Sequence, residues 1–136
     1  MKYVIFSIDN VHDLHTLAKF TRYVDTLRAM GYLKGDFKTL IGSYKSVMEY
    51  SFLCDRVDFD KHILLSGFVV NQKSFLSLSY TSNGRTAPRA LAKLWHNNSG
   101  GGEYGFGEFK EATKSEAMQC EGWTYDPTIN KYFIVE

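Results

Sequence analysis

The chain has few of the residues and patterns that mark a specialised class of protein. Its 136 residues include two cysteines and two prolines, and no apolar run approaches the ~18 residues needed to span a bilayer. Cys54 and Cys120 lie far apart and fit no metal-ligand spacing, so we expect free thiols in a reducing compartment. Residues 1–8 read as a strand rather than a signal peptide. These features predict a cytoplasmic protein that does not contact a membrane.

An excess of charge of either sign is also missing. Lys and Arg total 16, Asp and Glu total 15, and the formal net charge is +1. A strongly basic nucleic-acid scavenger would carry a large surplus of Lys and Arg. A DNA mimic would need a dense acidic face, and the acidic residues here are scattered. The charge balance therefore argues against both classes, although local patches of one sign stay open.

No catalytic or metal-binding set stands out. His12 and His15 have a spacing that two metal ligands could share, but no further ligands accompany them. Cys54 and His62 could be a nucleophile and its base, but no third group orients them. The glycines of 100–107 follow an expected helix and precede an expected strand, which is the wrong order for a phosphate loop. We therefore predict no catalytic residue, metal or cofactor, and favour a protein without enzymatic activity.

Aromatic residues are abundant. Ten Phe, nine Tyr and two Trp make up 15% of the chain. A sheet-rich core would explain this content, because aromatic residues favour strands. A recognition surface would explain it as well, because Tyr and Trp are enriched where proteins bind partners.

Hydrophobic periodicity predicts a single α+β domain over residues 1–136. The pattern indicates helices over 11–30, 59–69 and 87–95, with Asn10, Asp58 and Thr86 as their N-caps. Strands are expected over 3–8, 39–44, 47–56, 74–80, 104–110, 118–125 and 131–135. The expected fold is a mixed, mostly antiparallel sheet of five to seven strands with two or three helices, packed mainly on one face.

The strand over 47–56 carries polar residues where burial is expected. Glu49 and Ser51 share one face by the two-residue period of a strand, and Tyr44 and Lys45 lead into the turn before it. A buried carboxylate needs hydrogen-bond donors. The segment with Gln72 and Ser74 could supply them. Either a closed structural network or a pocket for a polar ligand would follow.

A second candidate surface combines basic and aromatic residues. Arg85, Arg89 and Lys93 would form one stripe on the expected helix, and Tyr104 and Phe106 follow shortly after. Basic side chains beside aromatic rings are typical of surfaces that bind single-stranded nucleic acid. A solvated helix face is the other interpretation, because glutamates are interleaved with the aromatic residues.

The residues just described also carry a resemblance. A strand with Glu-x-Ser and a strand with Gln-x-Ser-x-Leu occur in a diffuse set of small, uncharacterised phage and bacterial proteins, which this chain resembles over most of its length. The matching positions are Gly42, Tyr44, Glu49, Ser51, Phe52, Gln72, Ser74, Leu76, Trp123 and Tyr132. Ser46 departs from the pattern, since a glycine is expected after the Tyr-Lys turn.

The resemblance implies a role rather than a reaction. It suggests a phage-type accessory protein that binds and inhibits a host macromolecule in the host cytoplasm, with a defence factor as one candidate partner. Two alternatives stay open: a protein that binds single-stranded nucleic acid, and one that binds a small ligand or nucleotide.

Overall fold

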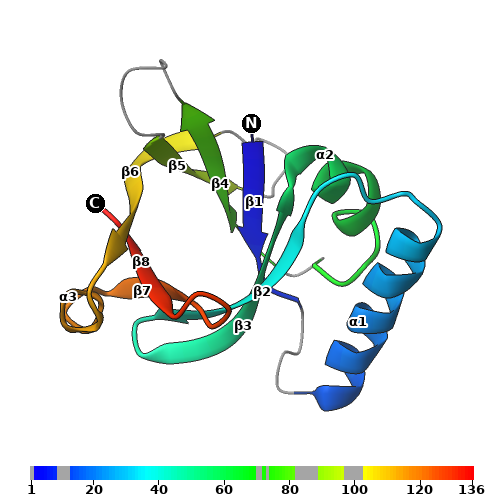
Figure 1. Ribbon diagram of the computed structural model, residues 1–136, viewed down its shortest axis with the longest axis horizontal. Helices are drawn as coiled ribbons and strands as arrows, with labels where there is room; N and C mark the ends of the chain where they lie inside the picture. Colours follow the sequence, from blue (N-terminus) through cyan, green and yellow to red (C-terminus); the bar gives the residue numbers. More distant parts are fainter. Residues whose placement is uncertain (1, 9–12, 70–71, 73, 82–88, 97–102) are drawn as a thin grey trace.

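Eight antiparallel strands form a closed barrel in the computed structural model, which describes residues 2–8, 13–69, 72, 74–81, 89–96 and 103–136. The strands are β1 (Lys2–Phe6), β2 (Phe37–Tyr44), β3 (Val47–Asp55), β4 (Ser74–Thr81), β5 (Arg89–His96), β6 (Glu103–Ala112), β7 (Gly122–Asp126) and β8 (Lys131–Val135). They follow one another around the barrel in the order β1-β3-β2-β7-β8-β6-β5-β4, and β4 returns to β1 (Figure 1). Every strand therefore has two hydrogen-bonded neighbours.

The fold predicted from the sequence is wrong. The expected sheet of five to seven strands in an α+β fold is instead a closed eight-stranded antiparallel barrel with short helices. The expected helix over 87–95 is largely strand β5, which hydrogen-bonds to β4 and β6. The expected strand over 118–125 is confirmed only in its second half, as β7, while Met118 ends the helix α3 (Lys114–Met118). In the segment over 87–95, which is rich in Ala, Leu and Lys, pairing with β4 and β6 has overridden the local preference for a helix.

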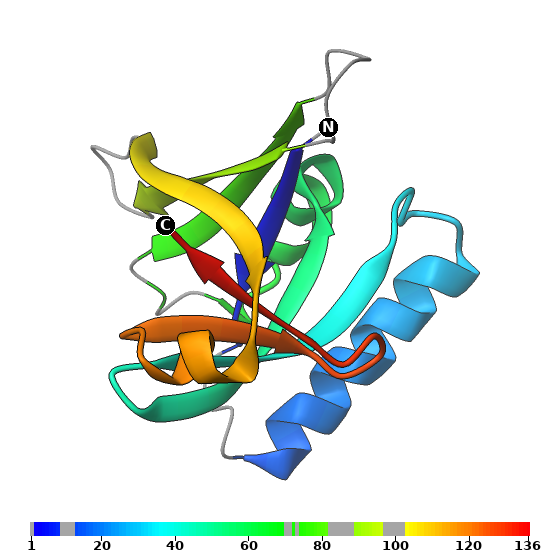
Figure 2. The same ribbon diagram turned by 60° about the vertical axis from the view of Figure 1, so that its left-hand side comes forward.

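The long helix α1 (Leu14–Ala29) packs on the outside of the barrel, alongside β2 and β3 (Figure 2). The face of α1 that packs against the barrel contains Phe20, Val24 and Leu27, which are buried. Leu14, which the sequence pattern places on that side, is 77% exposed. The expected cap Asn10 lies outside the described residues. Asp13 caps the helix, because its carboxylate accepts a hydrogen bond from His15 N at 2.9 Å.

Two apolar cores lie on the two sides of the barrel wall. The outer core joins β1, β3 and β4 to the helices and contains Val4, Phe6, Ile8, Phe20, Val24, Phe52, Cys54, Phe59, Ile63, Val69 and Phe75. The inner core fills the barrel and contains Ile5, Leu40, Leu78 and Ala92. Neighbouring residues of β1 enter different cores because successive side chains of a strand point to opposite faces.

A helical segment after β3 closes one side of the outer core. It consists of α2 (Arg56–Asp58) and a π-helix, η1 (Phe59–Ile63), and is shorter than the helix expected over 59–69. Asp55 rather than Asp58 caps it, accepting from Val57 N at 2.8 Å. Asp58 is buried instead and accepts from the backbone N–H groups of Lys34 and Gly35. It thereby ties the loop before β2 to the helical segment.

Candidate functional site

The β2–β3 hairpin carries four of the residues that the sequence singles out. Tyr44 and Lys45 lie at its tip, where Lys45 and Ser46 both have positive φ, +49° and +67°. Glu49 and Ser51 lie on β3 and alternate with residues that face outward. At the tip, Lys45 Nζ lies 5.4 Å from the centre of the Tyr44 ring and 3.9 Å from Glu121 Oε1. Tyr44 is 59% exposed on one side of the hairpin and Met48 is 57% exposed on the other, so both sides are accessible to a partner near the tip.

Four polar side chains meet where β1 ends, and we call them the polar cluster: Ser7, Glu49, Ser51 and Gln72. Ser7 Oγ donates to Glu49 Oε1 at 2.9 Å and lies 3.5 Å from Ser51 Oγ. Ser7 N donates to Gln72 Oε1 at 3.3 Å. Ser51 is buried at 6% exposure, whereas Glu49 is exposed. The cluster thus runs from a buried hydroxyl to an accessible carboxylate.

The hydrogen bonds of the cluster differ from the expected ones. The sequence suggests donors to Glu49 from Gln72 and Ser74, but the bond to Glu49 comes from Ser7. Glu49 lies on β3 and Gln72 precedes β4, and these two strands do not pair, since β1 lies between them. Ser74 pairs with His96 through the backbone of β5. Ser7 could have been found from the alternation of β1, in which Tyr3, Ile5 and Ser7 share one face.

Gly42 lies directly opposite Glu49 across the β2–β3 pair. A Cβ atom at this position would lie 2.7 Å from Ser51 Oγ, which is closer than real Cβ atoms approach another atom. Any other residue would therefore displace the Ser51 hydroxyl. The glycine thus allows the Ser51 hydroxyl to pack closely against the backbone of β2 at the buried end of the polar cluster.

An aromatic face lies on the outer side of the barrel wall, and we define it as Ile41, Met48, Tyr50, Trp123, Tyr125 and Tyr132. Tyr50 pairs with Ile41, Ile41 with Tyr125, and Tyr125 with Tyr132, so one row crosses four strands. Met48 and Trp123 both pair with Ser43 in the adjacent row. Side chains in one row of paired residues lie on the same face of the sheet.

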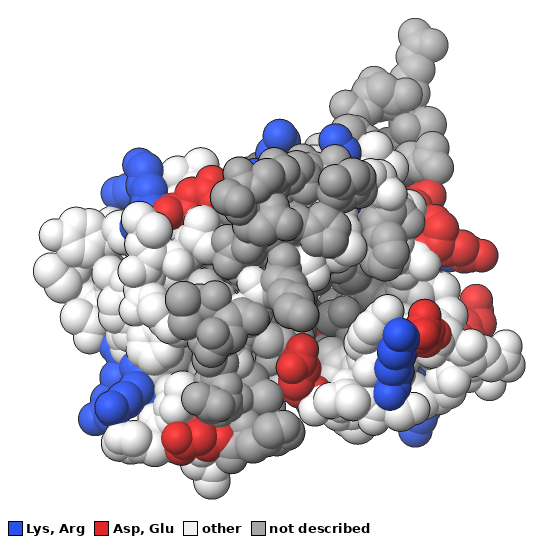
Figure 3. All heavy atoms as spheres, turned by 180° about the vertical axis from the view of Figure 1, so that it is seen from behind, with Lys and Arg blue, Asp and Glu red and all other residues white. Residues whose placement is uncertain are grey.

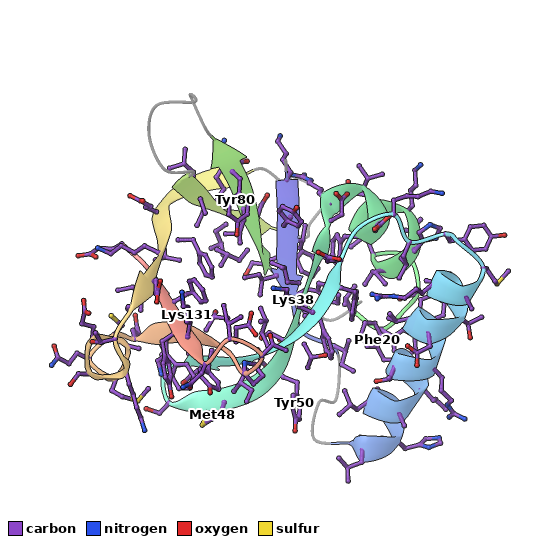
Figure 4. All side chains as sticks on the ribbon, in the orientation of Figure 1. Phe20, Lys38, Met48, Tyr50, Tyr80 and Lys131 are labelled. Carbon is purple, nitrogen blue, oxygen red and sulfur yellow. The ribbon has the colours of Figure 1, made fainter. Side chains whose placement is uncertain are left out.

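The rings of this face contact one another and are partly open to solvent. The Tyr132 ring centre lies 4.6 Å from that of Tyr125 and 5.5 Å from that of Trp123. Met48 is 57% exposed and Tyr50 is 44% exposed. Figure 4 shows these two side chains pointing away from the barrel on the same side of β3. The sequence placed Met48 and Tyr50 on one face but did not bring β7 and β8 beside them.

The basic stripe expected on a helix lies on a strand instead. Arg85 lies outside the described residues, Arg89 begins β5, and Lys93 is an exposed residue of β5 at an irregular pairing with β6. Lys93 pairs with Gly105, which lies between Tyr104 and Phe106 on β6. The backbone thus brings the two parts of the expected surface together, without the helical spacing that suggested it.

Chemistry at Cys54 is disfavoured by its surroundings. The thiol lies in the outer core, and burial together with the negative charges of Asp58, Asp55 and Asp60 raises its pKa. A raised pKa keeps the thiol protonated, and the thiol is a poor nucleophile in that form. Within the described ranges, no three His, Cys, Asp or Glu side chains come together as metal ligands would.

Basic and acidic side chains lie close together at several places on the described surface. On the face that Figure 3 shows, some Lys and Arg side chains lie next to Asp or Glu. Surface ion pairs include Lys38 with Asp126 at 3.7 Å and Lys131 with Glu111 at 3.4 Å. A surface of this kind creates little long-range attraction for a polyanion.

Comparison with known proteins adds no relative: no family model matches the chain, and no curated protein is similar to it. In the described part of the chain, none of the helices combines the length and the apolar character that crossing a membrane requires.

Proposed function

We propose that the chain is a binding protein without catalytic activity that docks a partner protein on its aromatic face. The observation that carries this proposal is the continuous row Tyr50–Ile41–Tyr125–Tyr132, flanked by the exposed Met48. Exposed apolar patches on monomers are usually interaction sites. Tyr, Trp and Met are enriched in protein interfaces, and Tyr and Trp are frequent among the few residues that dominate the binding energy.

The charge pattern favours a protein over a nucleic acid as the partner. A single-stranded nucleic acid also stacks on aromatic rings, but it needs a positively charged groove beside them. The basic residue at the hairpin tip is Lys45. Its ammonium group lies 3.9 Å from Glu121 Oε1, and this carboxylate partly neutralises its charge. The further step, that the partner is a host factor which the chain inhibits, stays a prediction from the resemblance.

Site-specific photocrosslinking tests the proposal. We would replace Tyr50 with the photoreactive benzoylphenylalanine and, as a control, do the same at Tyr32, which is 48% exposed and lies between α1 and β2. Both positions carry an exposed tyrosine, so the size and chemistry of the replacement are matched. We expect a discrete protein adduct from position 50 and none of the same mass from position 32.

Affinity measurements with the captured partner follow. We expect the double substitution Met48→Ser and Tyr50→Ser to weaken binding at least tenfold, about 1.4 kcal/mol. The matched control, Met30→Ser with Tyr32→Ser, also changes one exposed Met and one exposed Tyr and should leave the affinity within about twofold. Equal adducts from positions 50 and 32, or an adduct that nuclease removes, would overturn the proposal.

A further inference from the structure

The polar cluster offers oxygen atoms to a ligand. Glu49 contributes a carboxylate, Gln72 an amide oxygen, and Ser7 and Ser51 two hydroxyl groups. Ser7 Oγ occupies only Oε1 of Glu49, and among the described residues no donor or cation pairs with Oε2. A small group of converging polar atoms next to an apolar interior is typical of a ligand site.

The polar cluster is buried at one end and exposed at the other. Ser51 is buried and Glu49 is exposed, so the carboxylate is the part of the cluster that is accessible to a ligand from solvent. The absence of a side chain at Gly42 preserves the position of the Ser51 hydroxyl. Tyr50 and Phe52 point to the other side of β3, so the polar cluster is separate from the aromatic face.

The charge of the cluster decides the class of ligand. Glu49 brings one negative charge, and no described Lys or Arg pairs with it, which disfavours an anion. Divalent cations usually take several carboxylates or retain much of their water. One carboxylate with neutral oxygens around it suits a monovalent group that donates several hydrogen bonds. We propose that the polar cluster binds the guanidinium or ammonium group of an organic cation.

Titration by NMR with methylguanidinium is the direct test. We expect saturable shifts of the backbone amides of Ser7, Gly42 and Ser51, with a Kd of about 1 mM for so small a probe. N-methylurea has a similar shape without the charge and should cause shifts at least tenfold weaker. Absence of saturable shifts, or equal binding of the two probes, would overturn the proposal.

Substitutions separate binding from a purely structural role. Glu49→Gln keeps an oxygen that can accept from Ser7 and removes the charge, so the thermal midpoint should hold while affinity falls at least tenfold. Asp25→Asn makes the same change on the exposed side of α1 and should leave affinity unchanged. Gly42→Ala should weaken binding by displacing Ser51. Wild-type affinity in Glu49→Gln would refute the site, because a structural bond to Ser7 does not need the charge.

Two further probes distinguish the sources of the cation. Tighter binding of acetyl-arginine amide than of agmatine would assign the site to an arginine of a polypeptide. The reverse order would assign it to a free polyamine-type molecule. Failure of both to exceed methylguanidinium in affinity would overturn the inference that the cluster recognises a larger cation.

Discussion

The carboxylate of Asp58 fixes the loop between α1 and β2 against the start of the π-helix. It is 2% exposed and accepts hydrogen bonds from Lys34 N at 3.0 and 3.1 Å and from Gly35 N at 2.9 Å. Half-buried backbone N–H groups are stabilised by such partners, because leaving them without an acceptor costs free energy. One side chain thereby satisfies two donors of a loop that precedes the hairpin of the candidate site.

We expect Asp58→Ala to lower the free energy of unfolding by about 1–3 kcal/mol, since two half-buried N–H groups would lose their acceptor. Asp58→Asn should cost less, because its amide oxygen still accepts one of the bonds. Urea unfolding measures both. Asp36→Ala, an exposed aspartate in the same loop, is the control and should change the free energy of unfolding by less than about 0.5 kcal/mol. A loss for Asp58→Ala no larger than that of the control would contradict this role.

At the scale of elements, the β2–β3 hairpin is where sequence and structure agree best. The strands over 39–44 and 47–56 and the turn at Lys45-Ser46 are confirmed as β2, β3 and their tight connection. The resemblance also predicts a glycine at position 46. Ser46 has a φ of +67°, which is a conformation that favours glycine, and this gives the physical reason for that prediction. Two-residue hairpin turns with positive φ at both positions favour Asn-Gly, because glycine adopts this conformation without steric cost.

We expect Ser46→Gly to stabilise the protein by up to about 1 kcal/mol. Glycine relieves the steric cost of the left-handed conformation, about 1–2 kcal/mol, and this gain exceeds the extra entropy of the unfolded chain. Ser43→Gly is the matched control within β2, where glycine should destabilise by about 0.5–1 kcal/mol. Chemical denaturation distinguishes the two signs, and destabilisation by both substitutions would show that the turn carries no such strain.

The segment over 87–95 shows why other elements were missed. Its Ala, Leu and Lys residues favour a helix locally, and a Pro in the first turn supports that interpretation. The structure instead buries Ala90 and Ala92 and exposes Leu91 and Lys93, which is the alternation of a strand. Two alanines are only weakly hydrophobic, so they give little indication that this face is buried. The segment is a strand because β4 and β6 pair with it, and these partners cannot be identified from the local sequence.

At the scale of the whole molecule, closure of the barrel is the property that the sequence does not reveal. Alternation shows which side chains share a face but not which strands are neighbours. Lys2 of β1 opposes Ser79 of β4, although 77 positions separate them in the sequence. The same limit applies to both candidate sites. Glu49 and Ser51 are found from β3 alone, and the alternation of residues 3–8 gives the face of Ser7, but only the strand order brings Ser7 beside them. In the same way, the aromatic residues of β7 and β8 join Met48 and Tyr50 only through the strand order.

The two cores share the strands of the barrel wall and should therefore unfold together. Val4 and Phe6 of β1 enter the outer core, and Ile5 between them enters the inner core. Phe20 of α1 completes the outer core, with its ring 4.8 Å from that of Phe52 and 6.1 Å from that of Phe6. Loosening α1 would expose the outer side of strands whose inner side fills the barrel. The molecule should thus behave as a single cooperative unit.

We expect Phe20→Ala to lower the free energy of unfolding by about 3–5 kcal/mol, the cost of emptying a buried aromatic site. Helix ellipticity, which reports mainly on α1, and tryptophan fluorescence, which includes Trp123 on β7, should still follow one transition with a lower midpoint. Leu14→Ala, at an exposed position of the same helix, is the control and should shift the midpoint little. If the helix signal of Phe20→Ala were lost first while the fluorescence stayed native, α1 would unfold independently of the barrel, and the prediction of a single cooperative unit would be contradicted. The barrel would then have to be stable on its inner core alone, whose buried cluster of Ile5, Leu40, Leu78 and Ala92 is smaller than the outer one.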